Sequence, residues 1–514
     1  MPAIIDQNSS DLNHFFLNKI KAFTAALICL LFLNEHDSFA QQNYSAEIGT
    51  LLSSSSQTPF WLQSNNHGMY SANGSQAYAR FQYHRLFTDI SFFDLEIGGD
   101  LIARTGSDPS LFFNQGFLKI DAFGFELAAG RFFNTSPTHN EEIGMGSLGV
   151  SRNASPIPQV RLGSIGWLPI PFTGEFFEVK GHISHGWLGN NRFTDNVLLH
   201  EKTGHLKIGG SLPVNIYGGI AHYALWGGEN HPDVGDIPTR FSDFADVFFA
   251  QGGDESTPGI DQAFILGDHK GAIDFGLFMD LNDVSVTVYR QFPLETKDNL
   301  KLKSPQDALT GISFQFPDDS PFPFTQFVYE YLYTKYQDGP RRPNILDDGF
   351  NCAENPGVCR DDFRGNENYY NHELYRTGWA YQERSIGNPL FTLNETNTGF
   401  LNNRIVGHHI GFESQVGNAV VSAMGTYSRN YGIRCDNRHP NLGERELFGI
   451  QCQNRVDTVG GARLDQWSFI AGAELPVPLF SYGLTTLIID LALDNGKVSG
   501  SQVGTLIGLR WQPN

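Results

Sequence analysis

The chain has 514 residues, of which 18% are charged, 13% are aromatic and 55 are glycine. The aromatic content excludes a disordered chain, and glycine is far below the one residue in three that collagen needs. The 55 acidic residues outnumber the 35 basic ones, and this net charge of -20 argues against a nucleic-acid-binding protein. Many glycine and aromatic residues with few charges favour numerous strands, each with one apolar and one polar face.

Residues 1–40 are predicted to be a cleaved signal peptide. Lys19 and Lys21 precede the apolar run 22–33, which is too short to cross a bilayer as a helix. Ser38 and Ala40 supply the small residues of a cleavage site, so we expect cleavage after Ala40.

Export of the chain makes disulfides the expected state of its remaining cysteines. Cys352, Cys359, Cys435 and Cys452 lie in polar stretches whose spacing does not fit a zinc site. Four cysteines allow three pairings, of which we favour the local pairs Cys352–Cys359 and Cys435–Cys452.

Alternation of apolar and polar residues follows along most of the mature chain. Clear runs lie at residues 93–103, 123–130, 273–281, 284–289, 466–475 and 503–512. Most have about the 9–12 residues that a tilted strand needs to cross a bilayer.

The connections between these runs are of two kinds. Some are short, such as Asn282-Asp283, whereas residues 226–262, 336–378 and 430–462 are long and polar. This asymmetry predicts an all-β fold, a transmembrane antiparallel outer-membrane β-barrel of about 18 strands with long extracellular loops. The barrel is expected over residues 76–514, and residues 41–75 either plug it or lie in the periplasm. The alternative is a soluble β-sandwich, propeller or β-helix, but no self-similar repeat is visible.

The densest group of distinctive residues lies between about 144 and 228. It comprises the segments 149–163 (GVSRNASPIPQVRLG), 179–186 (VKGHISHG), 199–202 (LHEK), 219–222 (GIAH) and 226–228 (WGG). Together with the earlier segment 58–68 (TPFWLQSNNHG), this group resembles the capsule-assembly Wzi family of Gram-negative outer-membrane proteins, in the form typical of Bacteroidota-type sequences.

The resemblance implies an 18-stranded, lectin-like barrel that binds or anchors exported capsular polysaccharide and aids capsule assembly. It implies no enzymatic activity, so we expect no catalytic residues, no cofactor and no metal. The expected partners are capsular or other exported polysaccharide, outer-membrane lipid and the capsule export machinery, with no nucleic acid. The sequence departs from the enteric members, which carry a periplasmic helical bundle, because it has no long stretch of helical period.

Candidate residues for polysaccharide binding, or for a polar network in the lumen, come from this group. Arg, Asn and Gln can bind sugar hydroxyls and carboxylates through planar groups, and Trp can stack on sugar rings. Lys180 and His182 share the strand face opposite Val179 and Ile183, which we assign to the lumen. The full set of candidates is Arg152, Asn153, Gln159, Arg161, Lys180, His182, His200, Glu201, Lys202, His222 and Trp226.

Two other functions stay open on the sequence alone. A porin-like channel for small polar solutes would need an open lumen. An outer-membrane enzyme would need a cluster such as Asp/His or Ser/His at the rim, and no motif marks one.

Overall fold

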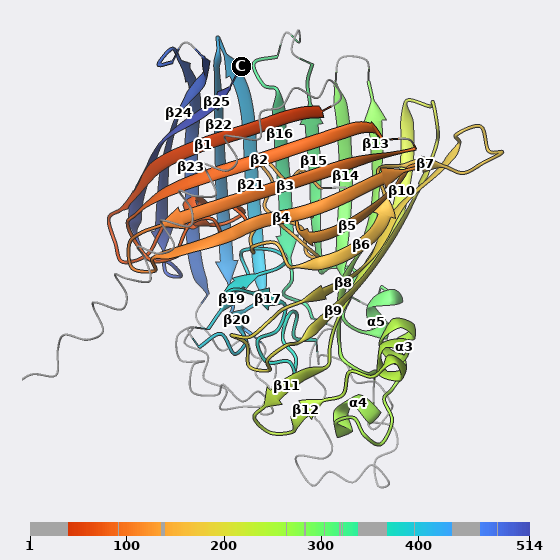
Figure 1. Cartoon of the computed structure of the whole chain (residues 1–514). Coiled ribbons are helices and arrows are strands. Elements are labelled where there is room, and N and C mark those ends of the chain that lie inside the picture. Colours follow the sequence, from red (N-terminus) through yellow and green to blue (C-terminus); the bar gives the residue numbers. More distant parts are fainter. Residues whose placement is uncertain are drawn as a thin grey trace, which may run out of the picture.

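A single closed wall of antiparallel strands forms the body of the molecule in the computed structural model (Figure 1). The structure describes residues 40–514, apart from residues 91, 135–138, 264, 282–283, 303, 318–319, 321, 338–366, 395, 434–462, 481 and 514. The wall strands are β1 (Ala40–Ser53), β2 (Gln76–Ile90), β3 (Phe93–Arg104), β4 (Ser110–Ala122), β5 (Phe125–Arg131), β6 (Gln159–Ser164), β7 (Leu168–Pro169), β8 (Phe177–Trp187), β9 (Leu198–Ile208), β10 (Val214–Trp226), β13 (Asp268–Asp280), β14 (Ser285–Pro293), β15 (Ala308–Gln315), β16 (Gln326–Tyr333), β21 (Ile405–Val416), β22 (Ala419–Asn430), β23 (Leu464–Val477), β24 (Gly483–Gly496) and β25 (Gln502–Pro513).

The wall closes between the first and last strands. β1 pairs antiparallel with β25, with Glu47 opposite Arg510, and the two side chains form an ion pair of 2.8 Å. β6 and β7 both pair with β8 and so occupy one position, which leaves 18 positions for the 19 strands of the sheet. Closure leaves no unpaired edge among the wall strands that the structure describes, and the predicted barrel of about 18 strands is confirmed.

The two faces of the wall differ in the way that the alternation predicts. Ile48, Phe113 and Leu491 point outward and are more than half exposed, as in a lipid-facing belt. Glu47 and Asp100 point inward and are buried, and Asp100 forms an ion pair of 2.8 Å with Arg80. The apolar face is therefore the outer one and the polar face lines the lumen.

The connections also divide as predicted. Short turns join strands at one end of the barrel, which we call the turn end, for example between β21 and β22. The long connections, which follow β10, β16 and β22, all leave from the opposite end, the loop end. Asn282 and Asp283 lie outside the described residues.

Short elements lie within the connections of the loop end (Figure 1). They are α2 (Phe60–Gln63), β11 (Gly228–His231), β12 (Gly235–Ile237), α3 (Phe241–Phe249), α4 (Gly259–Ala263), α5 (Lys297–Leu300), β17 (Ala380–Tyr381), β18 (Arg384–Ser385), β19 (Thr392–Leu393) and β20 (Phe400–Asn402). None of the helices described has the length and hydropathy that a membrane-spanning helix requires.

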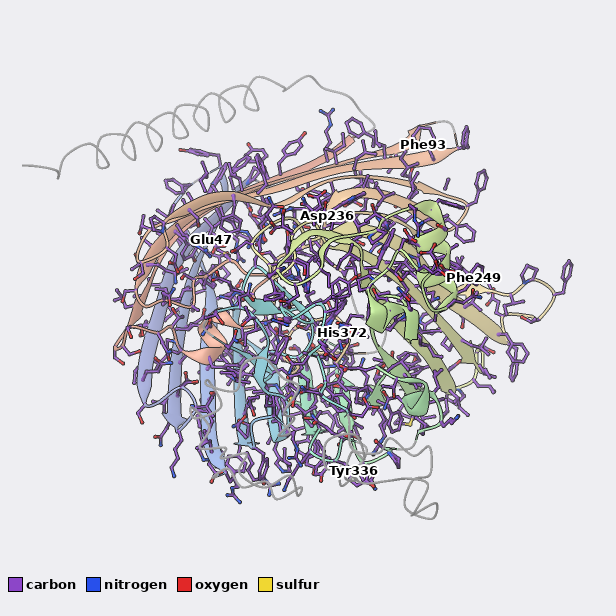
Figure 2. The ribbon with its side chains drawn as sticks, turned by 90° about the horizontal axis from the view of Figure 1, so that it is seen from below. Glu47, Phe93, Asp236, Phe249, Tyr336 and His372 are labelled. Atoms are coloured by element: carbon purple, nitrogen blue, oxygen red, sulfur yellow. The ribbon has the colours of Figure 1, made fainter. Side chains whose placement is uncertain are left out.

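Three of these connections fold back into the barrel and fill its lumen. They are the described residues within 54–75, 132–158 and 367–404, which we call the plug (Figure 2, seen from the loop end). The expected division at residue 76 is wrong, because β1 already belongs to the wall and only residues 54–75 of that segment enter the lumen. Strand β1 alternates like the other wall strands, with Ser45 and Glu47 buried between the exposed Ala46 and Ile48.

Candidate functional site

The plug has its own buried core, which joins its segments to one another. Trp379 is fully buried, and its indole N–H donates to the carbonyl oxygen of Gly149 at 2.6 Å. The hydroxyl of Tyr370 donates to the carbonyl oxygen of Leu148 at 2.5 Å. These bonds tie residues 367–404 to residues 132–158 through groups that are shielded from water.

Two of the predicted site residues, Arg152 and Asn153, lie in the plug and hold its segments together. The Arg152 guanidinium donates to the His67 ring at 3.2 Å and to the carbonyl oxygen of Glu141 at 3.1 Å, and burial lowers its pKa. The Asn153 amide donates to the carbonyl oxygen of Ser385 at 3.0 Å. Their side chains therefore connect all three plug segments.

Four other predicted residues, Arg161, Lys180, His182 and Glu201, lie together around a cavity of about 240 Å³ between the wall and the plug. Lys180 and His182 therefore face the lumen. His182 lies 3.4 Å from a Glu201 oxygen, and the Ser184 hydroxyl donates to the same oxygen at 2.9 Å.

The charges around this cavity are largely paired within the protein. Arg161 forms an ion pair of 2.6 Å with Glu126 and also donates to Asn134 at 2.9 Å. The Gln159 amide donates to the same Asn134 oxygen at 3.3 Å. We interpret this group as a network that braces the wall against the plug.

The remaining predicted residues, His200, Lys202, His222 and Trp226, do not face the lumen. Successive residues of a strand point to opposite faces, so the inward side chain of Glu201 requires that His200 and Lys202 point outward. On β10, the inward Tyr223 likewise places His222 and Trp226 outside. The expectation that His200, Glu201 and Lys202 share one lumen network is therefore wrong. His200, Lys202 and Trp226 lie beneath α3, whereas His222 lies 2.8 Å from a ring nitrogen of His269 on β13.

A larger groove at the loop end was not predicted from the sequence. Its volume is about 880 Å³, and it lies between the plug and the inner faces of β3, β4, β22 and β23. Hydroxyl and amide groups dominate its lining, among them Gln57, Gln63, Ser64, Asn73, Asn153, Gln382, Ser385, Asn397, Thr426, Ser428, Asn430, Gln466 and Ser468.

The four charged residues of the groove, Arg104, Asp108, Glu383 and Arg384, sum to zero charge, and three of them are held by hydrogen bonds within the protein. Arg384 donates to the carbonyl oxygens of Gln63 at 2.9 Å and Tyr70 at 2.5 Å, and burial lowers its pKa to about 10. Arg104 donates to the carbonyl oxygen of Gly68 at 3.2 Å. Asp108 accepts bonds of 2.6 Å from Ser71 and Asn73, which lower its pKa.

Two half-buried phenylalanine rings, Phe60 and Phe112, also line the groove. Phe112 lies on β4 beneath the Arg104 guanidinium, 5.2 Å from the ring centroid. The groove thus combines flat apolar faces with many neutral donors and acceptors, the set of groups that sugar rings and hydroxyls need.

Of the predicted site residues, Asn153 alone lines this groove. Its other residues come from parts of the chain as distant as Gln57 and Ser468, so no spacing in the sequence marks them. The one available signal was the segment 58–68, from which Phe60, Gln63, Ser64 and Gly68 enter the lining.

The cysteines for which disulfides are predicted, Cys352, Cys359, Cys435 and Cys452, lie outside the described residues.

Comparison with known proteins gives one sequence family and several structures. The family described as "Capsule assembly protein Wzi" matches residues 43–403, which is more than half of the chain. None of the curated proteins matches the sequence.

Among solved structures, Escherichia coli Wzi matches with a TM-score of 0.52 at 13% identity, covering 90% of this chain and 83% of that one. That structure is described as a carbohydrate-binding β-barrel, an outer-membrane protein involved in group 1 capsule assembly. Pseudomonas aeruginosa OccK5 matches with a TM-score of 0.46 at 8% identity over 93% of this chain and 98% of that one. OprD of the same organism matches with a TM-score of 0.45 at 8% identity, covering 92% of this chain and 93% of that one.

The E. coli Wzi match agrees with the closed antiparallel barrel described above, and the family match covers β1 to β20 and most of the plug. The chain is an outer-membrane β-barrel that belongs to the Wzi family of capsule assembly proteins.

Proposed function

We propose that this protein binds exported polysaccharide in the groove at the loop end of the barrel and thereby helps to hold the capsule at the cell surface. The observation that carries the proposal is a groove of about 880 Å³ lined by neutral amides and hydroxyls. It lies at the end with the long connections, which is the extracellular end in outer-membrane barrels. The family membership and the carbohydrate binding of E. coli Wzi support the same function.

The chemistry of the groove favours a polymer that is bound through its hydroxyl groups. The groove contains Arg104 and Arg384 against Asp108 and Glu383, so its charges cancel. Both arginines already donate to backbone carbonyl oxygens, which leaves them poorly placed to pair with a row of acidic sugars. The overall charge of -20 would also repel an acidic polymer at long range.

The filled lumen argues against the channel alternative. The plug crosses the interior, and buried bonds such as that from Trp379 to Gly149 keep it in place. We propose further that the protein acts by binding and not by catalysis, since the charged groups around the lumen cavity pair with one another instead of presenting a free nucleophile and base.

The proposal includes export and processing of the chain. Residues 1–40 would be removed as a signal peptide, and the mature chain would contact outer-membrane lipid through its belt and the capsule export machinery at the cell envelope. Determination of the N-terminal residue of the protein from outer membranes would test the cleavage after Ala40.

The first test is deletion of the gene, followed by measurement of cell-bound and shed polysaccharide. We expect the shed fraction to rise, and an unchanged partition would refute the function.

Complementation then tests the site. Phe112→Ala removes a groove ring, whereas Phe113→Ala removes its neighbour on β4, which points to lipid and is 62% exposed. We expect only Phe112→Ala to fail to restore the bound fraction at equal amounts of protein in the membrane. Equal rescue by both variants would place the binding site elsewhere.

A further inference from the structure

The helix α3 packs on the outside of the barrel wall. Val247 of α3 and Trp226 of β10 belong to a small buried apolar cluster that is separate from the plug core. Phe244 lies against the rings of Trp226 and His200, with centroid distances of 5.7 and 5.2 Å, and both of those residues point outward from the wall. Figure 1 shows α3 beside the loop ends of β8 and β9.

The apolar surface of α3 is wider than the part that contacts the wall. At about 100° per residue, its four phenylalanines, Ala245 and Val247 form one continuous arc, and Ser242, Asp243 and Asp246 form the remainder. Phe244 and Val247 are turned to the wall, whereas Phe241 is 85% exposed and Phe249 is 68% exposed. Figure 2 labels Phe249 at the end of this helix.

The height of α3 on the wall places these rings at the edge of the lipid belt. On β10 the exposed apolar belt begins at Val214 and continues through Ile216 and Ile220. A tilted strand crosses the hydrocarbon in about 9–11 residues, which from Val214 reaches His222 to Ala224. Ala224 is fully buried in the cluster that includes Val247, so α3 begins to cover β10 where the membrane ends.

Neighbouring aromatic residues mark the same level. Trp187, at the loop end of β8, points outward and is 44% exposed. Its ring centroid lies 5.3 Å from that of His185, and the His185 centroid lies 6.0 Å from that of Phe244 in α3. Aromatic girdles of this kind occupy the membrane–water interface of outer-membrane barrels. The exposed rings of α3 extend this girdle beyond the wall.

The charges of α3 are arranged so that its apolar arc stays uncharged. Asp243 is buried and pairs with Arg240 at 2.6 Å, and Arg240 also pairs with Asp254 at 2.9 Å. Beneath the helix, the Lys202 ammonium donates to the carbonyl oxygen of Phe248. The helix therefore covers His200 and Lys202, which would otherwise meet lipid at the outer face of the wall, where polar groups are costly.

We propose that α3 is an interfacial helix that rests in the outer leaflet of the outer membrane, with Phe241 and Phe249 among the acyl chains and with Ser242 and Asp246 toward the headgroups. The partner is membrane lipid, because the exposed arc continues the lipid belt of the wall. The helix thereby extends the lipid contact of the barrel and covers the outward polar residues His200 and Lys202 of β9. The inference is independent of the proposed polysaccharide binding.

Photo-crosslinking in a defined bilayer tests this placement. The full-length mature protein is reconstituted in phosphatidylcholine nanodiscs with p-benzoylphenylalanine at position 241 or 249, a replacement that preserves a phenyl ring at each site. Position 216 in the belt is the positive control, and position 236, an exposed residue of β12, is the aqueous control. Heat-modifiable migration in gels selects folded protein before irradiation.

We expect mass spectrometry to show a covalent phosphatidylcholine adduct at positions 216, 241 and 249 and none at 236. An adduct at 216 without one at 241 or 249 would overturn the proposal, because α3 would then lie above the bilayer. A covalent protein dimer at 241 or 249 in place of the lipid adduct would also overturn it, since a second copy would cover the helix.

Discussion

Replacement of Lys270 by methionine should release the plug from the wall. Lys270 lies on β13, and its ammonium pairs with Asp268 at 2.8 Å and Glu295 at 3.1 Å, with all three side chains less than 10% exposed. It also donates to the carbonyl oxygen of Asn371 in the plug at 3.1 Å. Glu295 in turn accepts a bond of 2.7 Å from the backbone N–H of Tyr370. This group is therefore a buried link between the wall and residues 367–404.

The size of the effect follows from the two carboxylates that lose their partner. Removal of one member of a buried ion pair costs about 3–5 kcal/mol, because the other charge stays desolvated. At about 1.4 kcal/mol per tenfold, the equilibrium constant for plug opening should rise between about 100-fold and 4,000-fold. Hydrogen exchange at amides within the plug, such as the Trp379 N–H that donates to Tyr370, reads this constant directly.

A matched triple variant separates charge from side-chain volume. Lys270→Met with Asp268→Asn and Glu295→Gln removes all three charges together and should recover most of the exchange protection. Burial raises the pKa of Glu295, while Lys270 lowers it, so loss of Lys270 should raise that pKa further. The defect of the single variant should therefore shrink toward low pH as the carboxylate takes up a proton. Unchanged exchange in Lys270→Met, within about threefold, would refute this reasoning.

Three further changes test the plug and the wall. Burial raises the pKa of Asp307 from 3.8 to about 6, so the folded state holds its proton more tightly and the free energy of unfolding should fall by about 2 kcal/mol as pH rises from 4 to 6. Asp307→Asn should remove this dependence in chemical denaturation across that range. Trp379→Phe leaves the buried carbonyl oxygen of Gly149 without its donor at 2.6 Å, and hydrogen exchange of the plug should show a loss of about 1–3 kcal/mol, whereas undiminished protection would contradict this role. Gly130→Ala places a Cβ 2.1 Å from the carbonyl oxygen of Gly116, at a residue whose φ is +122°. This variant should lower the temperature at which the barrel loses its compact migration in gels. Gly99→Ala, whose added Cβ would meet open space, should leave that temperature unchanged.

The sequence was sufficient to predict the strands of the wall, because inward and outward side chains alternate with the same two-residue period along them. Alternation in runs such as 93–103 identifies strands, and the same parity predicts which side chains meet lipid. It also explains why some of the candidate residues were assigned to the wrong face of the wall. His200, Glu201 and Lys202 are consecutive, so they could never have shared a lumen network, and strict use of the period would have placed the first and third outside.

The plug and the groove could not be predicted in the same way because their structure has no period. Tyr370 and Leu148 are neighbours in the lumen although more than 200 residues separate them. Nothing local to either residue selects the other, and only the closed wall brings the segments together. The helix α3 was missed for a different reason. It has only nine residues and lies within a long polar connection, so its few apolar residues do not distinguish it from a loop.

A fixed plug also determines what kind of binding site the groove can be. The floor of the groove includes Gln63 and Gly68, whose carbonyl oxygens accept hydrogen bonds from the partly buried Arg384 and Arg104. If the plug moved aside to open a channel, both guanidinium groups would lose these partners, and an unpaired buried polar group is costly. A site built on such a floor presents its amides and hydroxyls already in place, so little ordering free energy is lost when a polymer binds. The arrangement therefore favours a rigid binding surface for a long, hydroxyl-rich ligand over a gated pore.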